Sequence, residues 1–504
     1  MDKDVILVVG AGIMGAGIAQ VAAQAGHPVL LFDARPDAAA AARTNLAKTF
    51  ESLVAKGKLS DIAAREALAL IEPVTSLAAA AGAAIVVEAI VEKVEAKRAL
   101  FQELEAIVPE SAILATNTSS ISVTAIANGL RRPERLVGMH FFNPVPLMRL
   151  VEVVSGLQTA PAVADTIFEL SRAWGKVPVH ARSTPGFIVN RIARPYYAEA
   201  LALLHERAAD PATLDRCLRG AGFRMGPCEL MDLIGHDTNF SVTQSVYDAN
   251  FQDKRYVPSL VQRELVDGGL LGRKSGRGFY AYPAPAQPNP EIALDQPARP
   301  RHVVVHGSSV TADALASAAT SAVSAFGLAP GRDAGSAWTG LEIDNARLVL
   351  TDGRLADELA NELGTPDVAV FDRPLAWRPE AGPAALAYAV GTGASDLWKA
   401  QAAAWLAALG FAPARVDDTP GLVVARTVAM LINEAADAVQ QGVCSPEGAD
   451  TAMKLGVNYP AGPFEWLAGW SSRGVIAVID ALDAHYRGER YRVSPWLRRH
   501  AAWR

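Results

Sequence analysis

A glycine-rich turn near the N-terminus constrains the fold of this 504-residue chain more than any other feature. The apolar stretch 5–9 leads into the pattern G-x-G-x-x-G, made by Gly10, Gly12 and Gly15. A helical pattern follows, and then a second apolar stretch that ends at Asp33. In such a unit the first glycine makes the tight turn, the second lets backbone approach a pyrophosphate, and the third lets helix and strand pack closely. The order predicts a βαβ unit of an α/β fold.

The same turn predicts a dinucleotide site. A pyrophosphate would lie at the N-terminus of the helix that begins with Ile13 and Met14, where free N–H groups and the helix dipole favour negative charge. Asp33 would accept hydrogen bonds from an adenosine ribose and repel a 2′-phosphate, which favours NAD over NADP. Arg35 leaves NADP open, and a glycine-rich turn without a nucleotide is the simpler alternative.

A histidine and a glutamate stand on either side of a proline-broken loop in residues 137–154. His140 ends one apolar, β-branched run, and Glu152 lies twelve residues later inside the next. If the two runs pair as strands, the carboxylate reaches the far nitrogen of the imidazole. There it would hold one tautomer and stabilise the imidazolium that forms when the other nitrogen takes a proton. A core histidine beside a surface glutamate is the alternative.

Composition excludes several classes of protein. A net charge of −6 without any run of Lys or Arg argues against a nucleic-acid-binding surface. The three cysteines form no C-x-x-C pair and no disulfide framework, which is consistent with a reducing compartment. We see neither a signal peptide nor an apolar run long enough to span a bilayer, and we expect no metal site. A soluble cytoplasmic protein is expected.

The length suggests three or four domains. Alternating strands and helices over 1–183 predict a Rossmann domain with a parallel, doubly wound sheet. Helical patterns predict an all-helical domain over 184–282, and six prolines mark a linker at 283–300. A reduced Rossmann-like unit is expected over 301–410 and a second helical domain over 411–504. Within the first domain, further candidate strands lie at 83–90, 112–119, 135–142 and 149–155.

The last segment repeats the first helical domain. T-P-G-F-I-V-N-R at 184–191 returns as T-P-G-L-V-V-A-R at 419–426. G-P-C-E-L, starting at Gly226, returns as G-P-F-E-W from Gly462 at nearly the same offset. Matched spacing indicates an internal duplication.

The second copy lacks the features that carry chemistry in the first. Ala425 stands where Asn190 stands, and the turn before it carries only Gly307 in place of three glycines. Residues 301–504 are therefore expected to be non-catalytic. A hypothesis is that they replace a dimer contact within one chain.

Several motifs together resemble the L-3-hydroxyacyl-CoA dehydrogenase family, also called 3-hydroxybutyryl-CoA dehydrogenases. They are the glycine turn, VVEAIVE, ATNTSSIS, GMHFFNPVP, STPGFIVNR, GPCEL and GFY. The match covers about the first 282 residues. The remainder looks like the longer bacterial members, often associated with phenylacetate breakdown and 3-hydroxyadipyl-CoA.

The resemblance implies reversible, NAD-dependent oxidation of (S)-3-hydroxyacyl-CoA to 3-oxoacyl-CoA, as in fatty-acid or phenylacetate catabolism. It implies that His140 is the general acid and base and that Glu152 is its partner. Ser119 matches the family serine that hydrogen-bonds the substrate oxygen, and Asn190 matches the family asparagine that contacts the substrate carbonyl region. For Ser119, a helix cap is the alternative, although Ser120 or Ser122 could fill that role.

Other residues take roles only through the resemblance. Glu92 and Lys97 match positions near the nicotinamide ribose, and Asn117 and Ser119 lie in the cofactor loop. The acyl chain length stays open between 3-hydroxybutyryl-CoA and 3-hydroxyadipyl-CoA. A basic residue such as Arg224 or Arg194 could pair a distal carboxylate, which spacing cannot settle.

Two further readings compete with the first. The same scaffold could oxidise a 3-hydroxy compound without CoA, or the chain could be a catalytically silent scaffold subunit. The silent reading predicts a broken His–Glu pair or glycine turn in the N-terminal half, and both are intact. The expected partners are an acyl-CoA substrate and a second copy of the chain in a homodimer, with no nucleic acid and no membrane.

Overall fold

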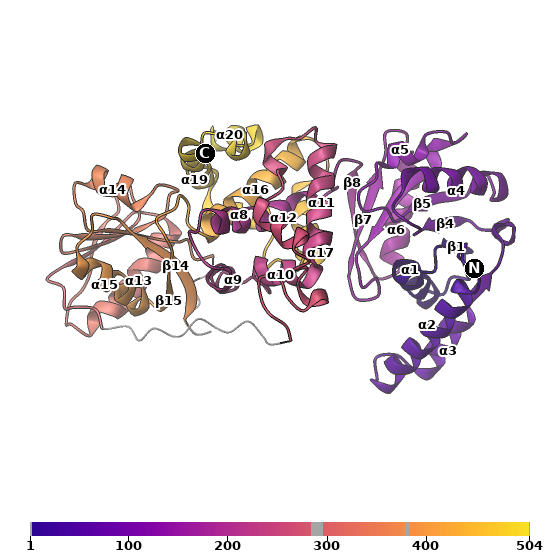
Figure 1. Cartoon of the computed structure of the whole chain (residues 1–504), viewed down its shortest axis with the longest axis horizontal. Helices are drawn as coiled ribbons and strands as arrows, with labels where there is room; N and C mark the ends of the chain where they lie inside the picture. The colour runs from indigo at the N-terminus through magenta and orange to yellow at the C-terminus, as the bar shows by residue number, and fades with distance from the viewer. Residues whose placement is uncertain (1–2, 284–295, 376, 378–382, 503–504) are drawn as a thin grey trace. The chain divides into compact units, whose positions relative to one another are not determined.

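The computed structural model describes residues 3–283, 296–375, 377 and 383–502. Most of the linker expected at 283–300 lies outside these residues. The chain forms two compact units: Met1–Arg191 with Ala438–Val457, and Ile192–Asp437 with Asn458–Arg504. Each is described by itself, and Figure 1 colours both by residue number.

The first unit is built on an eight-stranded sheet in the order β3-β2-β1-β4-β5-β6-β7-β8. Its strands are β1 (Ile6–Val9), β2 (Val29–Phe32), β3 (Ile71–Val74), β4 (Ile85–Glu88), β5 (Ile113–Thr116), β6 (Leu136–Phe141), β7 (Leu150–Ser155) and β8 (Val177–Arg182). Every neighbouring pair is parallel except β6 and β7, which are antiparallel. The predicted Rossmann fold is therefore confirmed, but β7 and β8 run opposite to the other six strands, so the sheet is mixed. β3 and β8 come in addition to the strands expected.

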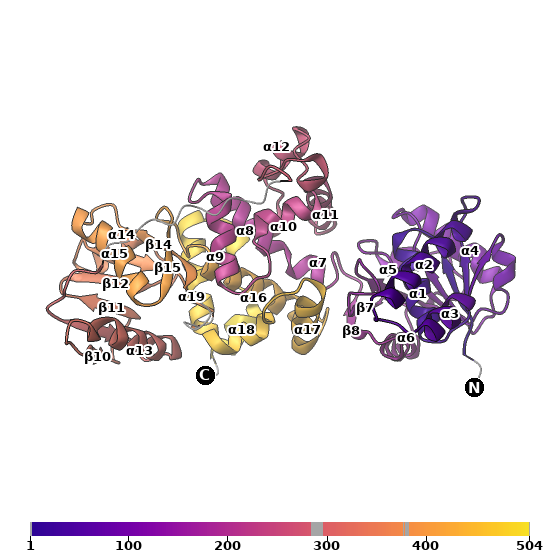
Figure 2. The same cartoon turned by 90° about the horizontal axis from the view of Figure 1, so that it is seen from below.

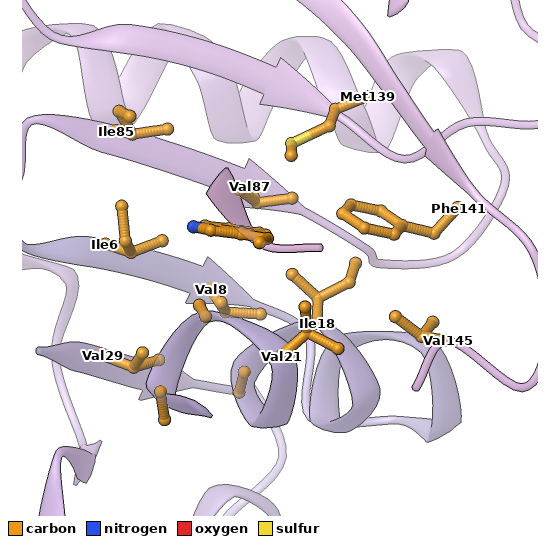
Figure 3. Close-up of a cluster of buried hydrophobic side chains, with 14 of the residues drawn as sticks. Ile6, Val8, Ile18, Val21, Val29, Ile85, Val87, Met139, Phe141 and Val145 are labelled. Carbon is orange, nitrogen blue, oxygen red and sulfur yellow. The ribbon is translucent and has the colours of Figure 1, made fainter. Parts of the chain in front are cut away.

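Helices cover the sheet and extend from it. They are α1 (Ile13–Gln24), α2 (Ala38–Ala55), α3 (Asp61–Ala69), α4 (Val94–Ile107), α5 (Val123–Ala127) and α6 (Pro161–Ala173). Figure 3 shows Ile18 and Val21 of α1 facing Val8 and Val87 from the central strands. Because these side chains are β-branched and buried, they suit both the pleated strand and the dry layer between helix and sheet.

A helix from far along the chain completes this unit. α17 (Pro446–Gly456) contacts β7 and β8, although it lies in the range expected for the second helical domain. A Cβ added at Gly456 would come within 2.8 Å of Leu150 and 2.9 Å of Val189, so only glycine allows this close approach.

The second unit contains a mixed seven-stranded sheet in the order β10-β9-β11-β12-β13-β14-β15. Its strands are β9 (Val303–His306), β10 (Gly331–Asp333), β11 (Gly340–Ile343), β12 (Ala346–Leu350), β13 (Val368–Phe371), β14 (Ala384–Val390) and β15 (Phe411–Arg415). Figure 2 shows its helices α13 (Val310–Ser324), α14 (Ala356–Leu363) and α15 (Asp396–Ala408). The directions of β12 to β15 repeat those of β5 to β8, while β11 runs antiparallel to both its neighbours.

The remaining helices form the two helical copies. The first has α7 (Val189–Ile192), α8 (Arg194–His205), α9 (Pro211–Gly220), α10 (Pro227–Ile234), α11 (His236–Ala249), the short η3 (Lys254–Tyr256) and α12 (Leu260–Asp267). The second has α16 (Val424–Gln440), α18 (Pro463–Trp470), α19 (Ser472–Tyr486), η6 (Glu489–Tyr491) and α20 (Pro495–Ala502). α9 packs on β14 (Figure 2), where a Cβ at Gly220 would lie 2.5 Å from the carbonyl oxygen of Ala385.

Reciprocal hydrogen bonds join the two copies inside the second unit. Glu199 of the first copy accepts from Arg490 at 2.9 Å and from the Tyr491 hydroxyl at 3.1 Å. The matching Glu434 of the second copy accepts from Arg255 at 3.4 Å and from the Tyr256 hydroxyl at 2.6 Å. Such exchange of equivalent contacts is the pattern of a two-fold dimer interface, here between two halves of one chain.

Candidate active site

The pairing of β6 with β7 sets His140 directly opposite Glu152. The imidazole Nδ1 lies 2.5 Å from a Glu152 carboxylate oxygen, and both side chains are buried. The other carboxylate oxygen accepts the backbone N–H groups of Ile188 at 3.0 Å and Val189 at 2.9 Å. With Nδ1 bound to a fixed carboxylate, Nε2 is the ring nitrogen left to exchange a proton.

A cavity of about 380 Å³ opens beside this pair. The predicted site residues that line it are His140, Ser119, Asn190, Asn117, Glu92, Lys97 and Met14. Ala89, Ile90, Phe141, Phe142 and Asn143 line it as well, and the sequence analysis did not single these out. Glu152 lies behind His140, outside the lining. The lining is formed by loops and by the ends of strands and helices at the carboxyl edge of the parallel strands. Open α/β sheets bind ligands at this edge.

The loop after β5 is organised by one carboxylate. Glu92 accepts from the Thr118 hydroxyl at 2.7 Å and from the backbone N–H of Ser119 at 2.9 Å. The cap of α5 is Ser122, which accepts from the N–H of Ala125. Ser119 is therefore not the helix cap, and it lines the cavity, where its hydroxyl donates to Glu92 at 3.4 Å.

A buried lysine lies against the same carboxylate. The Lys97 ammonium lies 2.6 Å from Glu88 and 3.2 Å from Glu92. The fully buried Glu88 also accepts from the Thr116 hydroxyl and the N–H of Ile90, both at 2.7 Å. Sequence analysis missed Glu88 as a site residue. Its signal is a carboxylate at the end of an otherwise apolar strand, a place that requires a buried partner.

The charge of Glu92 follows from its neighbours. Burial by itself raises the pKa of Glu92, but the Lys97 charge and the hydrogen bonds from Thr118 and Ser119 outweigh it, so that the pKa is lowered overall. Glu92 is thus held as a carboxylate at the edge of the cavity.

Two asparagines complete the wall around His140. The Asn117 side-chain oxygen accepts the N–H of Phe141 at 2.9 Å, which fixes the end of β6 just after the histidine. Asn190 lies on α7, directly after the two residues whose N–H groups bind Glu152, and its side chain lines the cavity. The start of α7 therefore positions both Glu152, which is the partner of His140, and the side-chain amide of Asn190.

The glycine turn has the geometry of a dinucleotide cradle. Gly10 has φ of +105°, a backbone conformation that favours glycine. A Cβ at Gly15 would meet the carbonyl oxygen of Gly10 at 1.7 Å, so strand and helix touch there. A Cβ at Gly12 would meet nothing within 4 Å, which leaves open space at the start of α1, beside the exposed Ile13.

Asp33, directly after β2, lies against this turn. Its carboxylate accepts the N–H of Ala11 at 2.8 Å and binds the Arg35 guanidinium at 3.0 Å. The hydrogen bond from Arg35 lowers the pKa of Asp33 to about 2, although burial opposes the shift. An ionised carboxylate beside open backbone at a helix N-terminus fits the ribose and pyrophosphate of NAD.

The part of the chain that the structure describes lacks two kinds of feature. No group of three or more His, Cys, Asp and Glu side chains in that part of the chain is placed to hold a metal ion. Within the same residues, no helix is both long enough and apolar enough to cross a membrane.

Family models match nearly the whole chain. The NAD-binding domain of 3-hydroxyacyl-CoA dehydrogenase matches residues 5–184. Its C-terminal domain matches twice, at 186–282 and 421–504. The reduced Rossmann-fold domain of 3-hydroxybutyryl-CoA dehydrogenase matches 348–420. The second match of the C-terminal domain agrees with the internal duplication.

Similar proteins carry consistent names. The chain is 44% identical to a 3-hydroxyadipyl-CoA dehydrogenase of Escherichia coli K12, over 99% of this chain and 98% of that protein. It is 41% identical to a probable 3-hydroxybutyryl-CoA dehydrogenase of Bacillus subtilis, over 56% of this chain and 98% of that protein. The shorter relative therefore corresponds to the N-terminal half alone.

A solved structure covers the full length. The crystal structure of 3-hydroxybutyryl-CoA dehydrogenase from Escherichia coli K12 superposes with a TM-score of 0.89 and 42% identity, over 100% of this chain and 99% of that one. These matches confirm an NAD-dependent oxidoreductase. The chain belongs to the 3-hydroxyacyl-CoA dehydrogenase family and carries that family's NAD-binding, helical and reduced Rossmann-fold domains.

Proposed function

We propose that His140 is the general acid and base for the interconversion of 3-hydroxyacyl-CoA and 3-oxoacyl-CoA. The close pairing of its Nδ1 with buried Glu152, beside a cavity, carries this proposal. In the oxidative direction Nε2 takes the proton of the 3-hydroxyl group, and Glu152 stabilises the imidazolium that results. In the reductive direction the protonated ring returns that proton to the alkoxide.

Ser119 and Asn190 are proposed to hydrogen-bond the reacting oxygen and the neighbouring carbonyl. Both side chains line the cavity with His140, which supports a shared substrate. Donors fixed at these positions stabilise negative charge that develops on oxygen, and such contributions are large in a site shielded from water.

The cofactor residues are proposed to be those of the glycine turn, with Asp33 and the pocket wall. The turn would hold the pyrophosphate and Asp33 the adenosine ribose, while Glu92, Lys97 and Asn117 would surround the nicotinamide ribose. NAD, when bound, supplies the acceptor for the hydride that leaves C3. The chain's own residues bind and orient it and move the proton.

The substrate is proposed to be a 3-hydroxyacyl-CoA with a short chain, either four carbons long or six carbons long with a terminal carboxylate. The names of the Escherichia coli and Bacillus subtilis relatives support these two alternatives. No observation in the structure favours a substrate without CoA.

The test is the loss of NADH absorbance with acetoacetyl-CoA, run beside acetoacetate without CoA. We expect turnover of the CoA ester only, and a rate lower by roughly 10²–10⁴-fold in His140→Ala. Unchanged NADH binding by the variant is the control for folding. Turnover of free acetoacetate at a similar rate would overturn the substrate class, and an active His140→Ala would overturn the proposed base.

The assembly is also a proposal. The sequence analysis expects a homodimer, but the reciprocal bonds of Glu199 and Glu434 support the alternative that the second copy replaces a partner subunit within one chain. Sedimentation velocity on the full chain distinguishes the monomer from the homodimer. We further propose the five-part domain division and a cytoplasmic location, and the unpaired state of all three cysteines supports the latter.

A further inference from the structure

Three charged side chains, Glu88, Lys97 and Glu92, form a triad at one wall of the cavity beside His140. The Lys97 ammonium lies 2.6 Å from a carboxylate oxygen of Glu88 and 3.2 Å from one of Glu92. Lys97 and Glu92 line the cavity, whereas Glu88 lies outside the lining and is fully buried. Because one ammonium neutralises only one of two carboxylates, the triad keeps one net negative charge.

The excess negative charge of the triad lies on Glu92. The buried Glu88 requires a countercharge, and it holds the ammonium at the shorter distance. Glu92 is the exposed member, with 37% of its side chain accessible. One of its oxygens accepts from neutral donors: the Thr118 hydroxyl at 2.7 Å and the N–H groups of Ser119 at 2.9 Å and Ser120 at 3.2 Å. These bonds stabilise the carboxylate without cancelling its charge.

The rest of the lining does not compensate this charge. Among the residues that the structure describes, the lining includes no Arg, no Asp and no second Lys. Its other ionisable side chain is His140, and that ring is paired with Glu152. While the ring is neutral, the His140–Glu152 pair adds a negative charge of its own. The wall around the cavity is therefore net negative.

A negative wall distinguishes the two oxidation states of a nicotinamide cofactor. The nicotinamide ring carries a positive charge when it is oxidised and none when it is reduced, while the ribose, phosphate and adenine groups are the same in both forms. The attraction between wall and ring is therefore present with NAD⁺ and largely absent with NADH. Contacts to the rest of the cofactor contribute equally to both forms and cancel in the comparison.

We propose that the triad makes this chain bind the oxidised cofactor more tightly, relative to the reduced cofactor, than a neutral wall would. Glu92 supplies the charge, and Glu88 is a positioning residue that engages the Lys97 ammonium so that Glu92 keeps its charge. The inference rests on the proposed function, which sets the nicotinamide ring beside His140. The same charge promotes release of NADH after hydride transfer, a step that limits turnover in many enzymes.

Separate dissociation constants for NAD⁺ and NADH test this inference. Both are measured by calorimetry on the full-length protein without substrate, and the ratio of Kd for NADH to Kd for NAD⁺ is compared among variants. Glu92→Gln keeps an acceptor for the neighbouring donors and makes the triad neutral. We expect the ratio to fall by roughly tenfold, mainly because NAD⁺ binds more weakly. An unchanged ratio would overturn the proposal.

Glu88→Gln tests the indirect role. Glu88 does not line the cavity, yet its loss leaves Lys97 to neutralise Glu92, so the ratio should fall as it does in Glu92→Gln. Structural damage alone would weaken the binding of both cofactor forms alike and leave the ratio at its wild-type value. That outcome would overturn the positioning role of Glu88.

A double variant restores the charge. Glu88→Gln combined with Lys97→Met removes both members of the buried pair, so no buried charge is left without its partner. Glu92 then carries the only charge of the triad, and the ratio should return to its wild-type value. A ratio as low as that of Glu92→Gln would overturn the proposal. This variant and Glu92→Gln keep the test valid if Glu88→Gln does not fold.

Glu134→Gln is the matched control. It removes the same charge from a side chain of similar exposure, 45%, which pairs with Arg132 just before β6. His140 lies near the other end of that strand, so the ratio should stay at its wild-type value. Equal effects of Glu134→Gln and Glu92→Gln would show that only the net charge of the protein matters, and would overturn the proposal.

Failure of the proposed function remains distinguishable from failure of this inference. The dissociation constants are measured without turnover, so an active His140→Ala would overturn the proposed base and leave the ratios readable. Tight binding of both cofactor forms, with the same ratio in wild type, Glu92→Gln and Glu88→Gln, would overturn this inference alone.

Discussion

The molecule builds the same strand-to-helix junction twice and places a histidine against its carboxylate only once. In the first copy, Glu152 of β7 accepts the N–H groups of Ile188 and Val189. In the second, Asp372, directly after β13, accepts those of Val423 at 3.0 Å and Val424 at 2.6 Å. These N–H groups occupy matching positions of the repeated sequence, so both junctions cap the helix with one buried carboxylate.

The two carboxylates come from different strands. β13 occupies the place in its sheet that β6 occupies in the first, because each is followed by an antiparallel and then a parallel neighbour. Asp372 thus lies close to the place where His140 stands in the first copy. It also accepts from Ala425, so its oxygens are occupied by backbone. The first copy keeps one carboxylate oxygen for an imidazole.

The difference teaches that the neighbours of a capping carboxylate decide whether it can also serve a second group. Both groups satisfy the helix start, and only Glu152 also faces a titratable ring beside a cavity. Burial raises the pKa of Asp372 to about 6, although the N–H groups oppose the shift.

The largest expected effect is on catalysis. Glu152→Gln keeps an acceptor for the two N–H groups but removes the negative charge that stabilises the imidazolium. We expect kcat for acetoacetyl-CoA reduction to fall by at least roughly 10²-fold. Asp372→Asn, the matched change in the second copy, should leave kcat unchanged. A similar loss in both variants would mean that the junctions act alike and would end the comparison.

A second prediction concerns the reciprocal contacts between the copies. Glu199→Gln removes the buried carboxylate that Arg426 and Arg490 share, whereas Glu434→Gln leaves Arg255 with the carboxylate of Asp437. Breaking a buried pair costs about 3–5 kcal/mol of unfolding free energy. Urea unfolding should show a loss of this size in Glu199→Gln and a smaller loss in Glu434→Gln.

The control for this pair is an exposed ion pair of the same unit. Asp480→Asn removes the partner of Arg498, where both side chains are about half exposed. The expected loss is about 0–1 kcal/mol. If Glu199→Gln loses no more unfolding free energy than Asp480→Asn, the reciprocal contacts do not stabilise the unit.

A third prediction uses the pH dependence of stability. The folded-state pKa of Asp372, about 6, lies above the unfolded value of about 3.9. Its contribution to stability is therefore full below pH 4 and is lost as the pH rises through 6. The unfolding free energy of wild type minus that of Asp372→Asn should fall by about 3 kcal/mol between pH 4 and pH 7. Parallel pH profiles of the two proteins would contradict it.

The smallest expected effect comes from copying the second repeat into the first. Asn190→Ala introduces the residue that Ala425 provides in the second copy. Loss of one donor to a charged oxygen should lower kcat by roughly 10²-fold and leave NADH binding intact. An unchanged kcat would show that the Asn190 amide does not account for the functional difference expected between the two copies.

The glycine turn and the His–Glu pair could be predicted because they lie on regular elements whose pairing follows from the sequence pattern. A βαβ unit and two neighbouring strands set the geometry of each, so residue order and alternation suffice. Glu88 could not be recognised in this way. Its partner Lys97 lies on α4, and only the three-dimensional structure shows that the two side chains meet at 2.6 Å.

Asp372 escaped prediction for a related reason. It did not fit the His-to-Glu spacing that identified the first site. Its capping role depends on N–H groups of residues far along the chain.

The docking of α17 on β7 and β8 has a consequence during synthesis. The first unit is complete only when Val457 has been made, 266 residues after Arg191. At about 5–20 residues per second, the ribosome needs roughly 13–50 s to cover that distance. During that interval Leu150 and Val189 lack the close contact that Gly456 makes with them. The part of the N-terminal sheet formed by β7 and β8 is therefore the last to be covered.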